Sequence, residues 1–135
     1  MAGSGVMTLI ALLLATLAAL LHVLIFAFES LLWTQESVWR RFGVTSLEQA
    51  RILRPMAFNQ GFYNLFLAVG TGVGVACLAA GQEQVGWTLI VFGCASMLGA
   101  AVALVSTGPQ YRRAAATQGA LPLLALVAAL IAWVS

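Results

Sequence analysis

Four long apolar stretches, separated by short polar links, dominate this 135-residue sequence. A helix needs about 20 consecutive apolar residues to cross the hydrocarbon core of a bilayer. Residues 6–33, 55–78, 85–105 and 118–134 are long enough to do so, and Gly81–Glu83 and Gly108–Pro109 mark breaks between the later ones. The pattern predicts an all-α, polytopic membrane protein, a bundle of four transmembrane helices.

The composition excludes a soluble domain. Hydrophobic residues make up 62% of the chain and charged residues only 7%, whereas a soluble domain carries about 25% charged residues. We expect one membrane-embedded domain over residues 1–135, with lipid as its main partner and no nucleic acid, because the net charge is only +2. Cys77 and Cys94 lie in different expected spans and are interpreted as packing residues, so no disulfide, metal or cofactor is expected.

The cations predict the orientation of the chain. All six are Arg: the first link carries Arg40, Arg41, Arg51 and Arg54, and the third carries Arg112 and Arg113. Positively charged links stay in the cytoplasm, so we expect both termini outside, in a multi-pass protein of a bacterial inner membrane. No Arg precedes residue 40, so the first apolar stretch is interpreted as a retained helix and not as a signal peptide.

The first link predicts a short helix on the membrane surface. Thr45 is expected to cap it and Glu48 to reach back to the cap. Apolar and Arg residues over 47–54 suggest that the helix is amphipathic and interfacial. Pro55 suits the first turn of the second span, where its missing N–H has no effect.

Small residues predict close helix packing in the middle spans. Gly70 and Gly74 form a G-x-x-x-G pair, and Ala95 and Gly99 repeat the spacing. Such pairs let helix backbones approach closely in lipid.

Polar residues inside the first two spans are the candidate functional groups, because ionisable side chains are costly in a membrane. His22 and Glu29 are seven residues apart and share a helix face, and Trp33 lies one turn further on. In the second span, Gln60 shares a face with Asn64. Asn59 and Tyr63 form a similar pair, and Gln118 opens the fourth span.

These groups lie at similar depths in the cytoplasmic half of the bundle. Glu29 lies about as many residues before the inner end of its span as Asn59 and Gln60 lie after the inner end of theirs. At about 1.5 Å of rise per residue, the three side chains are expected at similar depths. His22 and Asn64 lie deeper and roughly level with each other. We therefore expect a cavity lined by Glu29, Gln60 and Asn64, with His22 at its floor.

Simpler interpretations exist for each residue. Asn and Gln often only join membrane helices by hydrogen bonds, His22 could donate to a backbone carbonyl, and Glu29 could reach interfacial water. If Glu29 is buried, we expect it to be protonated or to be hydrogen-bonded by Asn59, Gln60 or His22. The indoles near the expected span ends are interpreted as interface anchors: Trp33, Trp39, Trp87 and Trp133.

The pattern resembles a widespread bacterial family of small four-span membrane proteins, domain-of-unknown-function family 1304. The resemblance rests on His22…Glu29-x-x-x-Trp33, Phe42-Gly43, Asn59-Gln60-Gly61-x-Tyr63-Asn64, the small residues from Ala95 to Gly99, and Gln118-Gly119. It covers nearly the whole chain, and the motif over residues 59–64 is its most specific part. Ala120-Leu121 before Pro122 departs from the family pattern, so the fourth helix is expected to start slightly differently. The resemblance implies the architecture and the importance of these residues, but no activity, since the family has no settled biochemical role; some members are labelled as epimerases.

Three functions remain open at this point. The polar residues could bind the head of a small lipophilic molecule, with Asn59, Gln60, Tyr63, Asn64, Trp33 and Gln118 as ligand-binding residues. Alternatively, Glu29 and His22 could relay a proton in a cofactor-independent isomerase or epimerase, with Tyr63 or Asn64 holding an oxyanion. The chain could also be an accessory subunit of a larger membrane complex or form a homo-oligomer.

Overall fold

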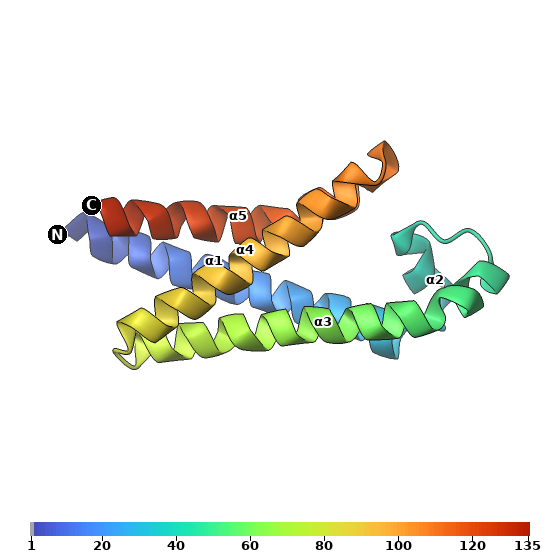
Figure 1. The fold of residues 1–135 in the computed structure, drawn as a ribbon, viewed down its shortest axis with the longest axis horizontal. Helices are drawn as coiled ribbons and strands as arrows, with labels where there is room; N and C mark the ends of the chain where they lie inside the picture. The colour runs from blue at the N-terminus through green and yellow to red at the C-terminus, as the bar shows by residue number, and fades with distance from the viewer. Residues whose placement is uncertain (1) are drawn as a thin grey trace.

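A computed structural model describes residues 2–135, with side chains from Gly5 onward, and within this range the chain is helical and contains no strand (Figure 1). The long helices are α1 (Ala2–Phe26), α3 (Leu47–Ala79), α4 (Glu83–Ser106) and α5 (Arg112–Val134). Short elements join them: a π-helical segment (Ala27–Leu31), α2 (Glu36–Trp39) and two 3₁₀ turns (Arg40–Phe42 and Pro109–Tyr111). Four helical stretches are long and apolar enough to cross a membrane, which confirms the expected all-α bundle.

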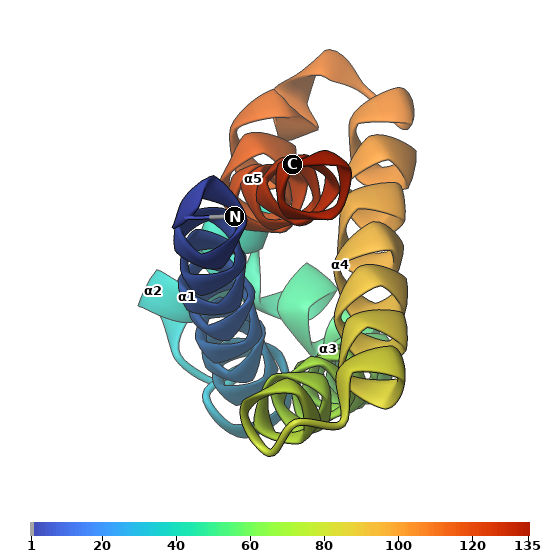
Figure 2. The ribbon, with the colours of Figure 1, turned by 90° about the vertical axis from the view of Figure 1, so that its left-hand side faces the viewer.

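The long helices form a ring in which each packs against two neighbours (Figure 2). Helix α1 packs against α3 and α5, and α4 packs against the same two, while α1 and α4 barely touch. Both termini and the α3–α4 turn lie at one end of the bundle, and the first and third links lie at the other (Figure 1). This topology gathers all six Arg residues at one end.

Backbone-to-backbone contacts hold α3 against α4. A Cβ on Gly74 would lie 2.9 Å from the backbone N of Ile90, and one on Gly86 would lie 2.7 Å from the backbone N of Leu78. Gly70 and Gly99, the expected partners in small-residue pairs, have open space around them. Gly74 therefore lies at a close helix approach, as expected, and faces Gly86 of α4, whereas Gly70 and Gly99 do not contribute to it.

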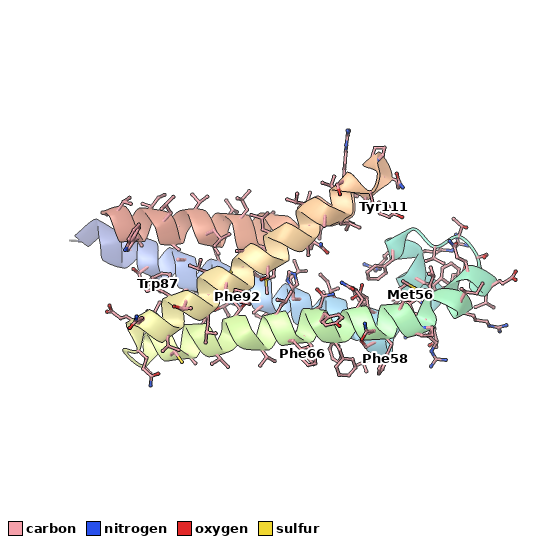
Figure 3. All side chains as sticks on the ribbon, viewed as in Figure 1. Met56, Phe58, Phe66, Trp87, Phe92 and Tyr111 are labelled. Carbon is pink, nitrogen blue, oxygen red and sulfur yellow. The ribbon has the colours of Figure 1, made fainter. Side chains whose placement is uncertain are left out.

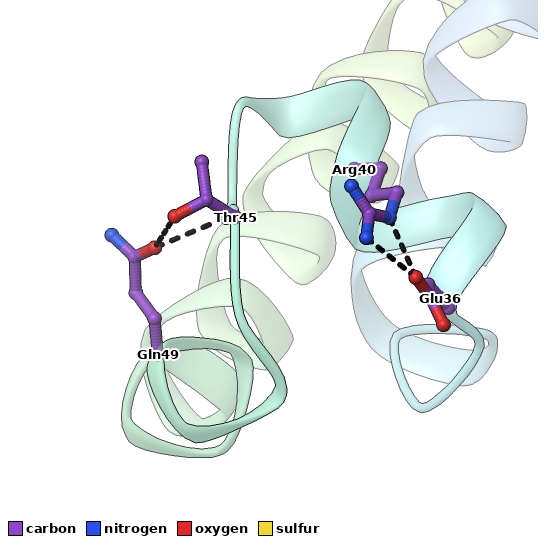
Figure 4. A network of polar contacts seen from close by, with 4 residues as sticks. All are labelled: Glu36, Arg40, Thr45 and Gln49. Atoms are coloured by element: carbon purple, nitrogen blue, oxygen red, sulfur yellow. Dashed lines mark hydrogen bonds and ion pairs between the residues drawn. The ribbon is translucent and has the colours of Figure 1, made fainter.

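The start of α3 differs from the expected separate interfacial helix. Helix α3 begins at Leu47 and runs without a break through Pro55, so residues 47–54 are its first turns. Ser46, and not Thr45, is the N-cap, and its hydroxyl accepts from the backbone N–H of Gln49 at 3.2 Å. The Gln49 side chain, and not that of Glu48, reaches back to Thr45, at 3.1 Å from its backbone N (Figure 4). Good helix formers throughout 47–54 make this continuation favourable.

Helix α5 also begins earlier than expected. It starts at Arg112 instead of residue 118 and includes Pro122 in its interior, where the ring is buried. A Cβ on Gly119 would lie 2.8 Å from the Cβ of Ala101 in α4, so Gly119 allows α4 and α5 to pack closely.

Phe58 and Phe66 are exposed on the side of α3 that faces away from α4 (Figure 3).

Candidate functional site

The helix that carries Glu29 changes its hydrogen-bond pattern at this residue. The backbone N–H of Leu32 donates to the carbonyl of Ala27 at 2.9 Å, an i to i+5 bond that defines a π turn over Ala27–Leu31. Such turns are rare and occur often at functional sites. The extra residue alters the direction of the side chains that follow Phe26, and Glu29 becomes buried, with 8% of its surface exposed.

Glu29 and Asn64 form the central contact of the site. Nδ2 of Asn64 donates to Oε2 of Glu29 at 2.8 Å and also lies 3.2 Å from the backbone carbonyl of Gln60. The donors named from the sequence, Asn59, Gln60 and His22, do not make this bond, and Asn64 makes it instead. The reason is geometric: Asn64 is partly buried beside the first helix, whereas the Asn59 side chain is exposed.

A close approach of two helices creates this contact. Gly61 packs against the π segment, and a Cβ there would overlap Oγ of Ser30 and lie 3.2 Å from the carbonyl oxygen of Phe26. Ser30 Oγ donates to the carbonyl oxygen of Phe58 at 2.8 Å, which joins the π segment to α3 directly. The rings of Phe26 and Phe62 meet edge to face at 5.2 Å beside it. Ser30 and Phe62 were not predicted from the sequence, although Gly61 inside the motif was a signal for such an approach.

His22 is buried above this site but does not contact Glu29. Its side chain is 1% exposed, and its Nδ1 lies 2.9 Å from the carbonyl oxygen of Ala18. A ring nitrogen facing a carbonyl must donate, so Nδ1 carries a proton and Nε2 of the neutral ring is an acceptor. Among the described residues no hydrogen bond joins His22 to Glu29.

The remaining predicted residues do not converge on Glu29. Asn59 and Gln60 have exposed side chains, and Tyr63 is 56% exposed with its ring 6.5 Å from that of Phe66. Gln118 is half-buried at the start of the last span, with no hydrogen bond of its side chain in the part of the chain described. At about 100° of rotation per residue, Asn59 and Tyr63 lie on a different face of α3 from Asn64.

The four indoles fall into two groups. Trp33 is 6% exposed and Trp39 is 3% exposed, so neither is the lipid-facing anchor that was expected. Instead, they pack together in a cluster under the first link, where Nε1 of Trp33 donates to the carbonyl oxygen of Ala50 at 2.9 Å. At the opposite end of the bundle Trp133 is 85% exposed and Trp87 is half-buried.

Two cavities lie on either side of the site, and neither is lined by Glu29 or Asn64. One of about 720 Å³ lies near the end of the bundle that carries the termini, between residues of α1, α3, α4 and α5 that include Leu78, Trp87 and Leu126. Another of about 220 Å³ lies beneath the first link. No cluster of metal-binding side chains occurs among residues 2–135.

The comparisons with known proteins give a family but no activity. A family model described as "Protein of unknown function (DUF1304)" matches residues 16–130. No curated protein and no solved structure matches the chain. The matched region includes His22, Glu29 and the whole 59–64 motif, and it covers well over half of the sequence. The chain therefore belongs to the DUF1304 family of proteins of unknown function.

Proposed function

We propose that this protein binds a small lipophilic molecule inside the Arg-bearing half of its bundle, and that Glu29 and Asn64 hold the polar head of that molecule. The observation that carries the proposal is the hydrogen bond from Asn64 to a buried Glu29 on a π turn. Polar groups placed this deep in an apolar bundle are costly and mark functional positions in membrane proteins.

The chemistry of the pair suits a neutral hydroxyl or carbonyl head. Only Oε2 of Glu29 has a partner among the described residues, so Oε1 is available to a ligand. Oδ1 of Asn64 is a second acceptor without a partner in the same range, because both contacts of that side chain use Nδ2. A protonated Glu29 donates and an ionised one accepts, so the pair can complement either head.

Several further properties belong to the same proposal. Residues 1–135 act as one membrane-embedded unit in the inner membrane of a bacterium, with both termini outside. The gathering of all six Arg at one end of the bundle supports this orientation, because such ends stay in the cytoplasm. The ligand then enters from the cytoplasmic leaflet, past the exposed Gln60.

We favour binding over the isomerase alternative for a geometric reason. A proton relay needs a hydrogen-bonded path between His22 and Glu29, and no hydrogen bond among the described residues joins the two side chains. The carboxyl of Glu29 has the carboxamide of Asn64 as its one partner among the described residues.

Mass spectrometry of co-purified small molecules tests the proposal. Asn64→Leu removes the donor at the site, and Asn59→Leu makes the same change on an exposed face one turn away. We expect the first variant to lose a lipophilic compound that the wild type and the second variant retain. Equal retention by both variants, with both correctly folded, would show that the Glu29–Asn64 pair does not bind it.

A further inference from the structure

A second cavity, of about 220 Å³, lies where the first link folds over the start of α3. It is separate from Glu29 and Asn64 and combines apolar, aromatic and basic side chains. Its lining residues are Trp33, Thr34, Trp39, Leu47, Ala50, Arg51 and Arg54.

Trp39, one of the lining residues, carries an unpaired buried donor. Trp39 is 3% exposed, and its indole Nε1 is buried with no acceptor among the described residues. The neighbouring Trp33 differs, because its Nε1 donates to the carbonyl oxygen of Ala50. Buried N–H groups without an acceptor are rare because they are unfavourable, so Trp39 indicates that an acceptor belongs in this place.

The lining also includes two cations without partners in the part of the chain described. Arg51 and Arg54 are three residues apart, which places them on one face of α3. Neither forms an ion pair or a hydrogen bond in the part of the chain that the structure describes, where the ion pair present joins Arg40 to Glu36 at 2.7 Å (Figure 4). Guanidinium groups match the geometry of phosphate oxygens closely.

We propose that this cavity binds the phosphate group of an anionic amphiphile. Arg51 and Arg54 supply the charge, and Leu47 and Trp33 supply an apolar wall for the start of the tail. Trp39 supplies a neutral donor once its buried Nε1 turns toward the phosphate. The site lies at the Arg-bearing end of the bundle, where anionic lipids of a cytoplasmic leaflet would meet it. This inference does not depend on the function proposed for Glu29 and Asn64.

Native mass spectrometry of the detergent-solubilised protein, titrated with phosphatidic acid or with phosphatidylcholine, tests the site. We expect phosphatidic acid to bind in preference, and the double variant R51Q/R54Q to bind it at least about tenfold more weakly, because two charge-assisted contacts are lost. The matched control R112Q/R113Q removes the same charge from the third link and should stay within about twofold of the wild type. An equal loss of affinity in both double variants would show that the lipid is attracted only by the overall positive charge of this end of the bundle, and would overturn the proposal.

A single-atom test separates recognition from folding. Trp39→Phe removes Nε1 but keeps an aromatic ring, and its stability without lipid is measured alongside, because the smaller ring loses some packing in the buried cluster. The affinity of this variant for phosphatidic acid should fall several-fold, whereas Trp133→Phe at the far end should have no effect. Unchanged affinity in Trp39→Phe would refute the role of the indole.

Competition by inorganic phosphate shows whether the site takes a lipid headgroup or a soluble phosphate ester. If it competes with phosphatidic acid, the site recognises phosphate alone and a soluble phosphate ester can fill it. If it does not compete while the lipid binds, the apolar tail is required and the ligand is a lipid. If neither phosphatidic acid nor inorganic phosphate binds, the proposal is overturned.

Discussion

Gly61→Ala should be among the most damaging single-methyl changes in this protein. The added Cβ would overlap Oγ of Ser30 and approach the carbonyl oxygen of Phe26 to 3.2 Å. Ser30 can rotate away only by losing its 2.8 Å hydrogen bond to Phe58, a loss of about 1 kcal/mol. Separating the π segment from α3 adds about 1–3 kcal/mol of overpacking. Relative to the same substitution at an open position of the helix, we expect the free energy of unfolding to fall by about 2–4 kcal/mol in total.

Denaturation in detergent micelles, followed by far-UV circular dichroism, measures this loss. Gly72→Ala is the matched control, because nothing lies within 4 Å of its Cβ and Ala favours a helix by up to about 1 kcal/mol. Adding Ser30→Ala to Gly61→Ala makes room for the new methyl group, so the double variant should recover part of the stability. A Gly61→Ala protein as stable as the control, or strictly additive losses in the double variant, would refute the close approach.

Three further predictions follow from the packing and the topology. Asn64→Leu should lower the free energy of unfolding by about 1–3 kcal/mol because it leaves a buried carboxyl without its partner, whereas Asn59→Leu should change it by less than about 0.5 kcal/mol; thermal unfolding of both variants compares them. Gly74→Ala should weaken the α3–α4 contact, since its Cβ would meet backbone atoms at 2.9 Å, and faster proteolysis of the variant than of the wild type would show the loss. In a variant without native cysteines, a membrane-impermeant thiol reagent applied from outside should label a Cys placed at Gln84 and miss one at Gln110; the reverse pattern would invert the orientation.

The apolar stretches sufficed to predict the four long helices, because span length follows directly from bilayer thickness. Their ends were harder to predict. Pro55 suggested a helix start, yet helix-favouring residues and the Ser46 cap carry α3 eight residues further toward the first link. Here local propensity and capping outweigh the single hydrogen bond that Pro removes.

Matched depth correctly suggested that Glu29 lies near the 59–64 motif, but it could not identify the partner. Depth depends only on rise per residue, whereas pairing depends on rotation about the helix axis. The π turn changes that rotation after Phe26, and the amino-acid types at residues 27–31 do not predict a π turn. Only the tertiary contact of Gly61 with this segment explains why Asn64, and not Asn59, meets the carboxyl.

The π turn has a consequence for how the first span tolerates changes in length. A helix with one i to i+5 turn holds one residue more than a continuous α-helical ladder over the same distance would need. Deleting Ala27 or Phe28, which precede Glu29 in the π turn, would therefore restore α-helical register, leave the packing of the preceding alanines against α5 in place, and turn Glu29 by about 100° relative to them. The assembly of the bundle and the direction of its buried carboxyl are thus set by separable features of one helix, and loss of a single residue is enough to uncouple them.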